Sequence, residues 1–505
     1  MGSGIYFDPG ISESGFQICL NFDRNSLMLN IAGKFNSDTY MIKYISIIIF
    51  LILLPFSLLA QENFFSKIDS FMKAHSEINN FNGNVLIAGS GKIIYQNAFG
   101  YRNFYTKELL DNNSVFELAS VSKQFTAMGI LLLIEKGKLS LSDSLRKFFP
   151  ELPYHDVTIQ NLLSHTSGLP DYMESMAVKW DHNKIAFNDD VIEFLAAEKI
   201  PVKFLPGEKF EYSNTGYEML ASIIEKVSGV SFKDYMDENV FQKLGMNNSR
   251  VYNTRRSSNE VIPDYAYGFV YSDSLSKYVL PDSIPELDAV YWLDGVQGDG
   301  IINSTAGDLL IWDRALKNST LLDEALQNEM FNPQSAADIE RKMYYGYGVF
   351  LSENKYGKYI YHSGGWPGYS TLLKRFLNGD FTIILLSNNE SDVRGISEGI
   401  AGILFEDEVI FPYVHKEVNV DPEELKKFAG SYTGLNTKID IVFREGKLYR
   451  DFDSRPDIEL KPESGNKFFY GDGRDIQIEF QTGPDNAIEK VWLISGGLKT
   501  ELQKN

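Results

Sequence analysis

Strand-type patterns on both sides of a long helical stretch constrain this fold most. Residues 84–89 and 93–100 are mostly apolar and flank a Ser-Gly-Lys turn, which predicts a β-hairpin. Strand patterns return at 345–351, 359–362, 369–376 and 381–387, whereas 115–340 is mainly helical in pattern. Because short hairpins cannot bury their faces alone, the early and late strands are expected to share one sheet. The sequence predicts an α+β fold, an antiparallel sheet flanked by helices with a mainly helical subdomain.

The N-terminal region has the pattern of an export signal. A short basic start at Met41 precedes an apolar run that ends with small residues before Gln61. This predicts a signal peptide over 41–60 and an exported protein, periplasmic or secreted by a bacterium. A retained membrane anchor is the less favoured alternative, because the run is shorter than the roughly 20 residues of a spanning helix. Residues 1–40 are interpreted as a mis-called or disordered leader.

Composition excludes several classes of function. The net charge is −20, which disfavours a nucleic-acid partner. The only cysteine is Cys19, and the six histidines are scattered, so neither a thiolate nor a zinc site is predicted. No metal or cofactor is expected. The expected partner is a small molecule or a peptide, and a membrane is expected to be involved only through the export signal or an anchor.

Two regions follow the signal. A large α+β domain is predicted over 61–410 and a Pro-containing linker over 411–421. Residues 422–505 begin with a short helix and continue with alternating strand patterns, which predicts a small C-terminal all-β domain, a small sheet or partial barrel.

The first candidate for chemistry is Ser120, in a Ser-x-x-Lys pattern with Lys123. Six such patterns occur, and Ser120 stands out because it precedes the strongly apolar helix predicted over 121–136. Residues i and i+3 share one helix face, so Lys123 is expected to reach the Ser120 hydroxyl as a base. Its pKa would have to fall from ~10.4 toward ~7–8 for that role. The alternative for Ser120 is an ordinary helix N-cap.

A second candidate precedes the helix predicted over 214–228. Tyr212 and Asn214 form a Tyr-x-Asn pattern there. The Tyr212 hydroxyl is a candidate proton shuttle for Ser120, if it is deprotonated or bonded to Lys123, and Asn214 can donate to a substrate carbonyl. A polar helix-start loop is the alternative.

The third candidate is the run His362, Ser363, Gly364 and Gly365, expected at the end of a strand. Consecutive glycines allow a substrate to approach the backbone closely. One amide here and the amide of Ser120 could therefore form an oxyanion hole. A β-bulge or turn would also explain the two glycines.

Together and in this order, these motifs resemble those of the class C β-lactamase, DD-peptidase and esterase superfamily of serine hydrolases. The stretches 162–169, 298–305 and 386–388 also resemble that family, and 425–434 resembles its appended lipocalin-like β domain. The resemblance implies Ser120 as nucleophile, Lys123 and Tyr212 as catalytic partners, and substrate contacts at Asn214 and 362–365. It also implies that Gly365 supplies the second oxyanion amide. His165 and Ser167 are interpreted as scaffold.

One departure from the family narrows the expected activity. His362 stands where β-lactamases have lysine, and a neutral imidazole attracts a carboxylate less than an ammonium does. We therefore expect an esterase, D-aminopeptidase or DD-peptidase-like enzyme rather than an efficient β-lactamase. A class C β-lactamase and a non-catalytic penicillin-binding sensor stay as alternatives. An α/β-hydrolase with Ser397 in a G-x-S-x-G pattern is disfavoured, because no strand runs directly into that pattern.

Overall fold

The computed structural model describes the residues 17–23, 26–32, 64–253, 261–434, 437–452, 456–483 and 487–505. Its contacts divide the chain into two compact units, Met1–Ser66 and Lys67–Asn505. In the first unit, β1 (Gln17–Asp23) pairs antiparallel with β2 (Ser26–Ala32). The predicted signal peptide, 41–60, lies outside the described residues. Among the residues that are described, no helix is both long and apolar enough to span a bilayer.

An eight-stranded sheet forms the centre of the second unit, and all its paired strands are antiparallel. The order is β12-β13-β14-β15-β16-β17-β3-β4. The late strand β17 pairs directly with the early strand β3, so the predicted union of the two strand groups is confirmed. The strands are β3 (Gly83–Gly89), β4 (Lys92–Phe99), β12 (Ser335–Asp338), β13 (Met343–Tyr345), β14 (Phe350–Asn354), β15 (Gly357–Trp366), β16 (Tyr369–Phe376) and β17 (Phe381–Ser387).

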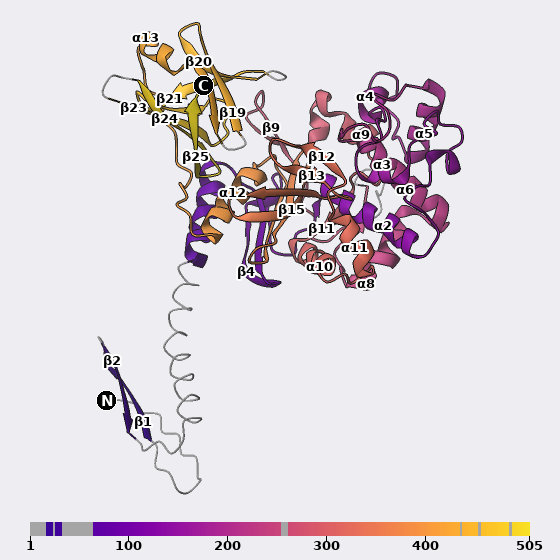
Figure 1. Ribbon diagram of the computed structural model, residues 1–505, viewed down its shortest axis with the longest axis horizontal. Helices are drawn as coiled ribbons and strands as arrows, with labels where there is room; N and C mark the ends of the chain where they lie inside the picture. Colours follow the sequence, from indigo (N-terminus) through magenta and orange to yellow (C-terminus); the bar gives the residue numbers. More distant parts are fainter. Residues whose placement is uncertain are drawn as a thin grey trace. The chain divides into compact units, whose positions relative to one another are not determined.

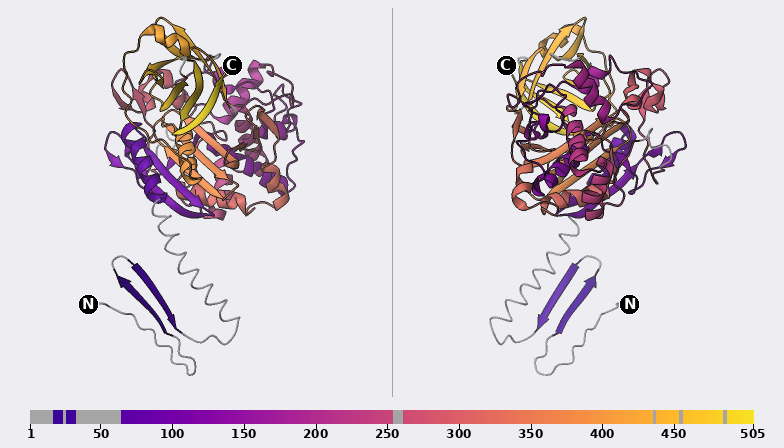
Figure 2. Two further views of the ribbon diagram at one scale, coloured as in Figure 1. Left: turned by 60° about the vertical axis from the view of Figure 1, so that its left-hand side comes forward. Right: turned by 90° about the vertical axis from the view of Figure 1, so that its right-hand side faces the viewer.

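Helices cover both faces of this sheet (Figures 1 and 2). On β17, Ile384 and Leu386 belong to the main hydrophobic core, which α10 (Ala306–Lys317) also enters. The intervening Ile383 and Leu385 point to the opposite face, because side chains alternate along a strand. There α12 (Val393–Leu404) packs on β16 and β17. A helix at 64–78 buries Ile68, Phe71, Met72 and His75. The fold prediction is confirmed.

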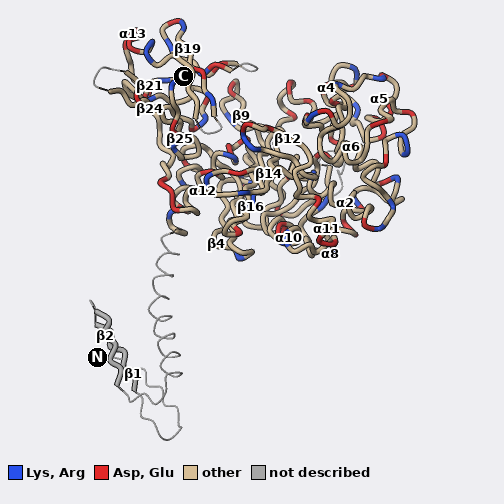
Figure 3. Tube along the Cα trace, in the orientation of Figure 1, with Lys and Arg blue, Asp and Glu red and all other residues tan. Residues whose placement is uncertain are grey.

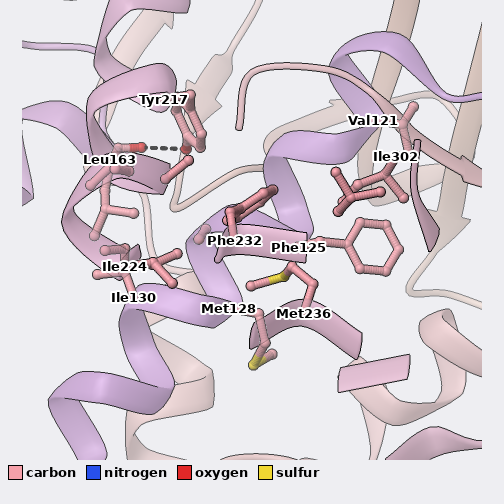
Figure 4. Close-up of a cluster of buried hydrophobic side chains, with 14 of the residues drawn as sticks. Val121, Phe125, Met128, Ile130, Leu163, Tyr217, Ile224, Phe232, Met236 and Ile302 are labelled. Atoms are coloured by element: carbon pink, nitrogen blue, oxygen red, sulfur yellow. Dashed lines mark hydrogen bonds between the residues drawn. The ribbon is translucent and has the colours of Figure 1, made fainter. Parts of the chain in front are cut away.

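The helical part of the unit surrounds α2 (Lys123–Glu135), whose side chains are buried from Lys123 to Leu133. α6 (Asn214–Ser228) packs beside it and ends at Gly229, as predicted. Figure 4 shows Phe125 and Ile130 of α2 among Ile224 and Met236. The remaining helices are α3 (Ile159–Leu163), α4 (Tyr172–Met176), α5 (Asn188–Glu198), α7 (Phe232–Met236), α8 (Gln242–Leu244), α9 (Ala289–Trp292) and α11 (Glu324–Met330). A helix buried on all sides is a rigid support for residues at its start.

One predicted strand is wrong. The run 345–351 is not continuous, because β13 ends at Tyr345 and β14 begins at Phe350. The chain turns between them, with the Gly346 N–H donating to the Val349 carbonyl at 2.9 Å. Gly348 has φ +76°, and a Cβ there would lie 2.8 Å from the Lys123 carbonyl oxygen. Glycine is needed because this turn packs directly on the first residue of α2.

The C-terminal strands β18 to β25 close into an eight-stranded barrel, which confirms an all-β region there. The strands are β18 (Gly430–Gly434), β19 (Thr437–Arg444), β20 (Lys447–Asp451), β21 (Ile458–Pro462), β22 (Lys467–Tyr470), β23 (Ile476–Thr482), β24 (Ile488–Ser495) and β25 (Leu498–Lys504). The short predicted helix corresponds to α13 (Pro422–Leu425) and a 3-10 turn. The exact domain boundaries stay predictions.

The barrel touches α12 through the turn between β24 and β25. A Cβ at Gly496 would lie 2.2 Å from the Gly395 carbonyl oxygen, and one at Gly399 would lie 2.6 Å from the Gly496 carbonyl oxygen. The two backbones therefore meet without intervening side chains. Lys and Arg are interspersed with Asp and Glu over the described chain (Figure 3).

Candidate active site

The segment that carries Ser120 is fixed between the sheet and α2. A 3-10 turn, Ala119–Ser122, precedes α2, so Ser120 is not the helix N-cap. Ala119 has φ +48°, a left-handed conformation that is uncommon for a residue other than glycine. The Leu118 N–H donates to the Ile302 carbonyl at 2.8 Å, and the Ile302 N–H donates to the Ser122 hydroxyl at 3.1 Å. These bonds hold a strained nucleophile turn in place.

Lys123 connects the first two predicted motifs. Its ammonium donates to Ser120 Oγ at 3.2 Å and to Asn214 Oδ1 at 2.8 Å. A third bond, at 2.7 Å, goes to the backbone carbonyl of Asp299. The side chain is fully buried. The structure thus brings Ser120, Lys123 and Asn214 together, as the spacing predicts, while the role of Lys123 as a base stays a prediction.

Sequence reasoning missed Asp299 as a partner of Lys123. Its carbonyl lies in a glycine-flanked segment that packs on α6, where Gly298 has φ +107° and a Cβ would lie 2.5 Å from the Tyr217 carbonyl oxygen. The Tyr172 hydroxyl donates to Asp299 Oδ2 at 3.0 Å. Burial raises the pKa of the Asp299 carboxyl, against the opposing effect of Lys123. The family resemblance at 298–305 pointed to this segment. It could not identify the hydrogen bond, because a backbone carbonyl can be supplied by any type of residue.

Tyr212 is close to Lys123 but is not bonded to it. The Lys123 ammonium lies 5.0 Å from the centroid of the Tyr212 ring. The Tyr212 hydroxyl is buried and has no hydrogen-bond partner within the described part of the chain. The Tyr212–Lys123 hydrogen bond that the sequence analysis considered is therefore not formed in this structure. The three protons of the Lys123 ammonium are instead donated to Ser120, Asn214 and Asp299.

His165 holds the backbone of the Tyr212–Asn214 segment through a hydrogen bond. It is fully buried, and its Nδ1 accepts the Ser213 N–H at 3.1 Å. Its ring lies 4.3 Å from the Tyr212 ring, measured between centroids. Burial, followed by the charge of Lys123, lowers the pKa of His165 well below its usual value. A neutral imidazole that fixes the backbone is a scaffold residue, as the sequence analysis interpreted it.

The third motif forms the last part of β15, at the end of a strand as expected. Residues 362–366 pair in regular register with β16, whereas the pairing of β15 with β14 stops at Tyr361. One edge of this segment therefore faces the nucleophile turn. A Cβ at Gly364 would lie 2.2 Å from the Leu118 carbonyl oxygen and 3.0 Å from the Ser120 nitrogen. The turn or bulge interpretation is wrong, because the glycine is required for this close approach.

Gly365 has open space on its side-chain face, since a Cβ there would meet no atom within 4 Å. It lines the same cavities as Ser120. The proposed oxyanion amides, those of Ser120 and Gly365, thus belong to two segments in contact through Gly364. Their role stays a prediction.

His362 is buried and neutral. Its Nε2 lies 3.2 Å from the Tyr345 hydroxyl, and its Nδ1 lies 2.8 Å from the Ser363 carbonyl oxygen. Burial, followed by the charge of Lys123, lowers the pKa of His362 to about 3. The imidazole therefore carries no positive charge near neutral pH.

A cation does reach the third motif from α12. Arg394 donates to Ser363 Oγ from Nη2 at 2.6 Å and from Nε at 3.1 Å. The sequence analysis did not identify Arg394, because its position in the site depends on how α12 packs on the sheet. Its guanidinium therefore lies beside Ser363.

Ser120 lies between two cavities. One, of about 140 Å³, is lined by Asn214, Met173, Asp299 and Trp366 among others. The other, of about 680 Å³, is lined by Tyr212, His362 and Arg394, together with Arg474 from the loop between β22 and β23. A ligand can thus extend to both sides of Ser120.

The other chemistry considered from the sequence finds no support. Ser397 lies inside α12, is buried, and donates to the Arg394 carbonyl at 2.8 Å, so it does not occupy a nucleophile elbow. Over the described residues, no group of three His, Cys, Asp or Glu side chains is placed to hold a metal ion.

Comparisons with known proteins agree with this architecture. A model of the β-lactamase family, described as "Beta-lactamase", matches residues 68–402. The chain is 40% identical over 435 residues to "Penicillin-binding protein 4*" of Bacillus subtilis (strain 168), covering 85% of this chain and 96% of that protein.

Two solved structures are similar as well. The octameric penicillin-binding protein homologue from Pyrococcus abyssi is 25% identical with a TM-score of 0.61, over 87% of this chain and 99% of that one. The D-amino acid amidase from Ochrobactrum anthropi SV3 shares the fold at 24% identity, with a TM-score of 0.56 over 68% of this chain and 98% of that one.

Proposed function

The chain belongs to the β-lactamase family of serine hydrolases, and we propose that it cleaves ester, amide or peptide bonds through an acyl-enzyme on Ser120. The observation that carries this proposal is the Lys123 ammonium, which bonds both Ser120 Oγ and Asn214 Oδ1. A hydroxyl fixed against an amine and beside an open cavity is the arrangement of an activated nucleophile.

In the proposed reaction, Lys123 acts as the neutral amine and takes the proton of Ser120 Oγ as that oxygen attacks the acyl carbon; Lys123 becomes an ammonium in this step. The oxyanion that forms accepts hydrogen bonds from the Ser120 and Gly365 amides. The bond to the leaving group then breaks, and the leaving atom takes a proton through the Tyr212 hydroxyl. Water hydrolyses the Ser120 ester in a second passage through the same steps, which releases the acid and regenerates the serine.

We propose further that the enzyme is esterase, D-aminopeptidase or DD-peptidase-like and a poor β-lactamase. The buried, neutral His362 supports this, because it offers no ammonium to a β-lactam carboxylate at that position. The Asn214 amide nitrogen faces Met173 in the smaller cavity, at 3.8 Å from its sulfur, and is placed to donate to an acyl-side carbonyl.

We also propose that the protein is exported, to a periplasm or the exterior of a bacterium. The proposal rests on the basic start, apolar run and small residues of 41–60. Fractionation of cells that express the full chain, with N-terminal sequencing of the product, tests it. A mature chain that begins near Gln61 is expected, and a full chain in the cytosol would contradict it.

A substrate panel tests the hydrolase. The purified full-length protein is assayed with a p-nitrophenyl ester, a D-amino-acid amide, a peptide ending in two D-residues and a chromogenic cephalosporin, with Ser120→Ala as the blank. We expect turnover of the ester and of at least one amide or peptide, and slow turnover of the cephalosporin. Stoichiometric labelling by penicillin without any turnover would favour a sensor instead.

A further inference from the structure

The hydrogen bonds of Lys123 all go to uncharged groups. Its ammonium donates to a hydroxyl, to an amide oxygen and to a backbone carbonyl, those of Ser120, Asn214 and Asp299. The side chain is fully buried. A charge that leaves water is costly unless an opposite charge compensates it. The ammonium form of Lys123 therefore needs a negative charge close by.

The carboxylate of Asp299 is placed to supply that charge. Its side chain is only 6% exposed, and the Tyr172 hydroxyl donates to its Oδ2 at 3.0 Å. Tyr172 keeps its proton, because burial, followed by the charge of Asp299, raises the pKa of Tyr172 well above its usual value. Burial raises the pKa of the Asp299 carboxyl, and the charge of Lys123 opposes that rise. The two charged groups thus interact through space, in addition to the bond that the Asp299 carbonyl accepts.

We propose that Asp299 is a positioning residue whose carboxylate balances the buried charge of Lys123 and thereby sets the pH range in which Lys123 becomes the base for Ser120. The inference rests on the proposed function, in which the neutral amine of Lys123 takes the serine proton. A negative charge nearby favours the ammonium over the neutral amine. Asp299 therefore moves the onset of acylation to higher pH.

The imidazoles and tyrosines around Lys123 are the next groups to consider. Burial, followed by the charge of Lys123, lowers the pKa of both His165 and His362, so these rings are neutral near pH 7. The rings of Tyr212 and Tyr217 lie 5.0 and 5.6 Å from the ammonium, measured to their centroids. Burial raises the pKa of Tyr217, whose hydroxyl donates to a backbone carbonyl at 2.9 Å. Neither the imidazoles nor Tyr217 supplies the negative charge.

Four further carboxyl groups interact with Asp299 or line the same cavity. Glu218 is fully buried, and burial raises its pKa well above the usual value, so it holds its proton near pH 7. Asp171 caps α4, where its Oδ1 accepts a backbone N–H at 3.1 Å. Glu117 and Asp294 line the smaller cavity together with Asp299. Asp299 differs from these four because its own carbonyl accepts a proton of the ammonium.

The pH dependence of acylation tests this role. The full-length enzyme is assayed with a p-nitrophenyl ester between about pH 5 and pH 9.5, with Ser120→Ala as the blank, because kcat/KM reports the ionisation of the free enzyme. Asp299→Asn keeps the backbone carbonyl and an oxygen for Tyr172 but removes the charge. We expect the midpoint of the rising limb to move to lower pH by about one unit, which raises kcat/KM about tenfold on the acidic side of the profile.

Two matched variants separate the charge from the fold. Asp299→Glu keeps the carboxylate, so its midpoint should lie closer to that of the wild type than the midpoint of Asp299→Asn. Asp308 is also a buried carboxylate, 5% exposed, and accepts from the Ser249 hydroxyl at 2.8 Å. It is not one of the described residues that line the two cavities beside Ser120. We expect Asp308→Asn to keep the wild-type midpoint.

The outcomes distinguish this inference from the proposed function. An unchanged midpoint in folded Asp299→Asn, or a midpoint at higher pH, would overturn the inference while leaving the hydrolase standing. Asp299→Ala also removes the charge and decides the matter in the same way if the asparagine variant does not fold. If the wild type hydrolyses no ester and resists fluorophosphonate labelling at every pH, the proposed function fails, and this inference with it.

Discussion

Gly364 and Ser120 are in direct backbone contact, so closely that a methyl group on Gly364 would lie 3.0 Å from the Ser120 nitrogen. The strand that bears the third motif and the turn that bears the nucleophile are thereby held at a fixed distance. This contact distinguishes two adjacent glycines that look equivalent in the sequence.

Gly364→Ala should destabilise the fold, whereas Gly365→Ala should not. The first forces the Leu118 carbonyl and the Ser120 turn to move, which should lower the free energy of unfolding by about 1–3 kcal/mol and the rate of acylation by at least about 100-fold. The second meets no atom within 4 Å, so its thermal midpoint should match that of the wild type. Differential scanning calorimetry and a burst assay measure both, and equal midpoints for the pair would contradict this account.

Ser120→Ala should abolish covalent labelling and lower kcat for the p-nitrophenyl ester by at least about 10³-fold. The hydroxyl accepts one hydrogen bond, from Lys123, so the fold should tolerate its loss. Mass spectrometry after incubation with penicillin or a fluorophosphonate checks the label, and circular dichroism checks the fold. Retained activity in a folded variant would show that Ser120 is not the nucleophile.

Lys123→Met should slow acylation by orders of magnitude, because the methionine fills a similar volume but cannot accept the proton of Ser120. It also removes the donor to Asn214 and to the Asp299 carbonyl. Stopped-flow measurement of acylation separates this step from deacylation. Lys136→Met, on the exposed end of the helix, serves as the control and should keep the wild-type rate.

His165→Phe should destabilise the protein by about 1–3 kcal/mol, because the buried Ser213 N–H loses its acceptor. His165→Asn should be milder, since asparagine offers an acceptor and tolerates the left-handed backbone at this position, where φ is +55°. Urea unfolding of the three proteins gives the order. A phenylalanine variant as stable as the wild type would remove the proposed scaffold role.

His75 should make the protein less stable as the pH falls. Burial lowers its pKa from 6.5 to about 4 in the folded chain. The unfolded chain therefore takes up a proton below about pH 6.5 that the folded chain takes up only near pH 4, so this contribution is complete above pH 6.5 and is lost on acidification. Its size is about 3 kcal/mol. Unfolding free energies between pH 7 and 4 should fall less steeply in His75→Gln, and parallel curves would contradict the assignment.

Local rules predicted the parts of the site that depend on local geometry. The bond between Lys123 and Ser120 follows from i, i+3 spacing, and the start of α6 at Asn214 follows from helix signals. Arg394 and Arg474 escaped prediction, because only tertiary packing brings α12 and a barrel loop to the same cavity.

Contacts made by backbone atoms could not be predicted from the sequence either. The carbonyl of Asp299 completes the set of acceptors around Lys123, yet any residue supplies a carbonyl. The strand predicted over 345–351 failed for a related reason, since the glycines that break it are needed for packing: Gly348 packs on α2, and Gly346 packs on the end of α11 at Met330.

The meeting of Gly496 with Gly395 and Gly399 bears on how such chains can recombine. This backbone contact has no room for a side chain on α12 or on the β24–β25 turn. A barrel from a related chain will therefore pack only on a helix with matching glycines. Arg394 stands one position before Gly395 on that helix. Chimeric proteins should therefore take α12 and the β24–β25 turn from the same parent. Substitutions at the glycines of one side should likewise be limited by the glycines of the other.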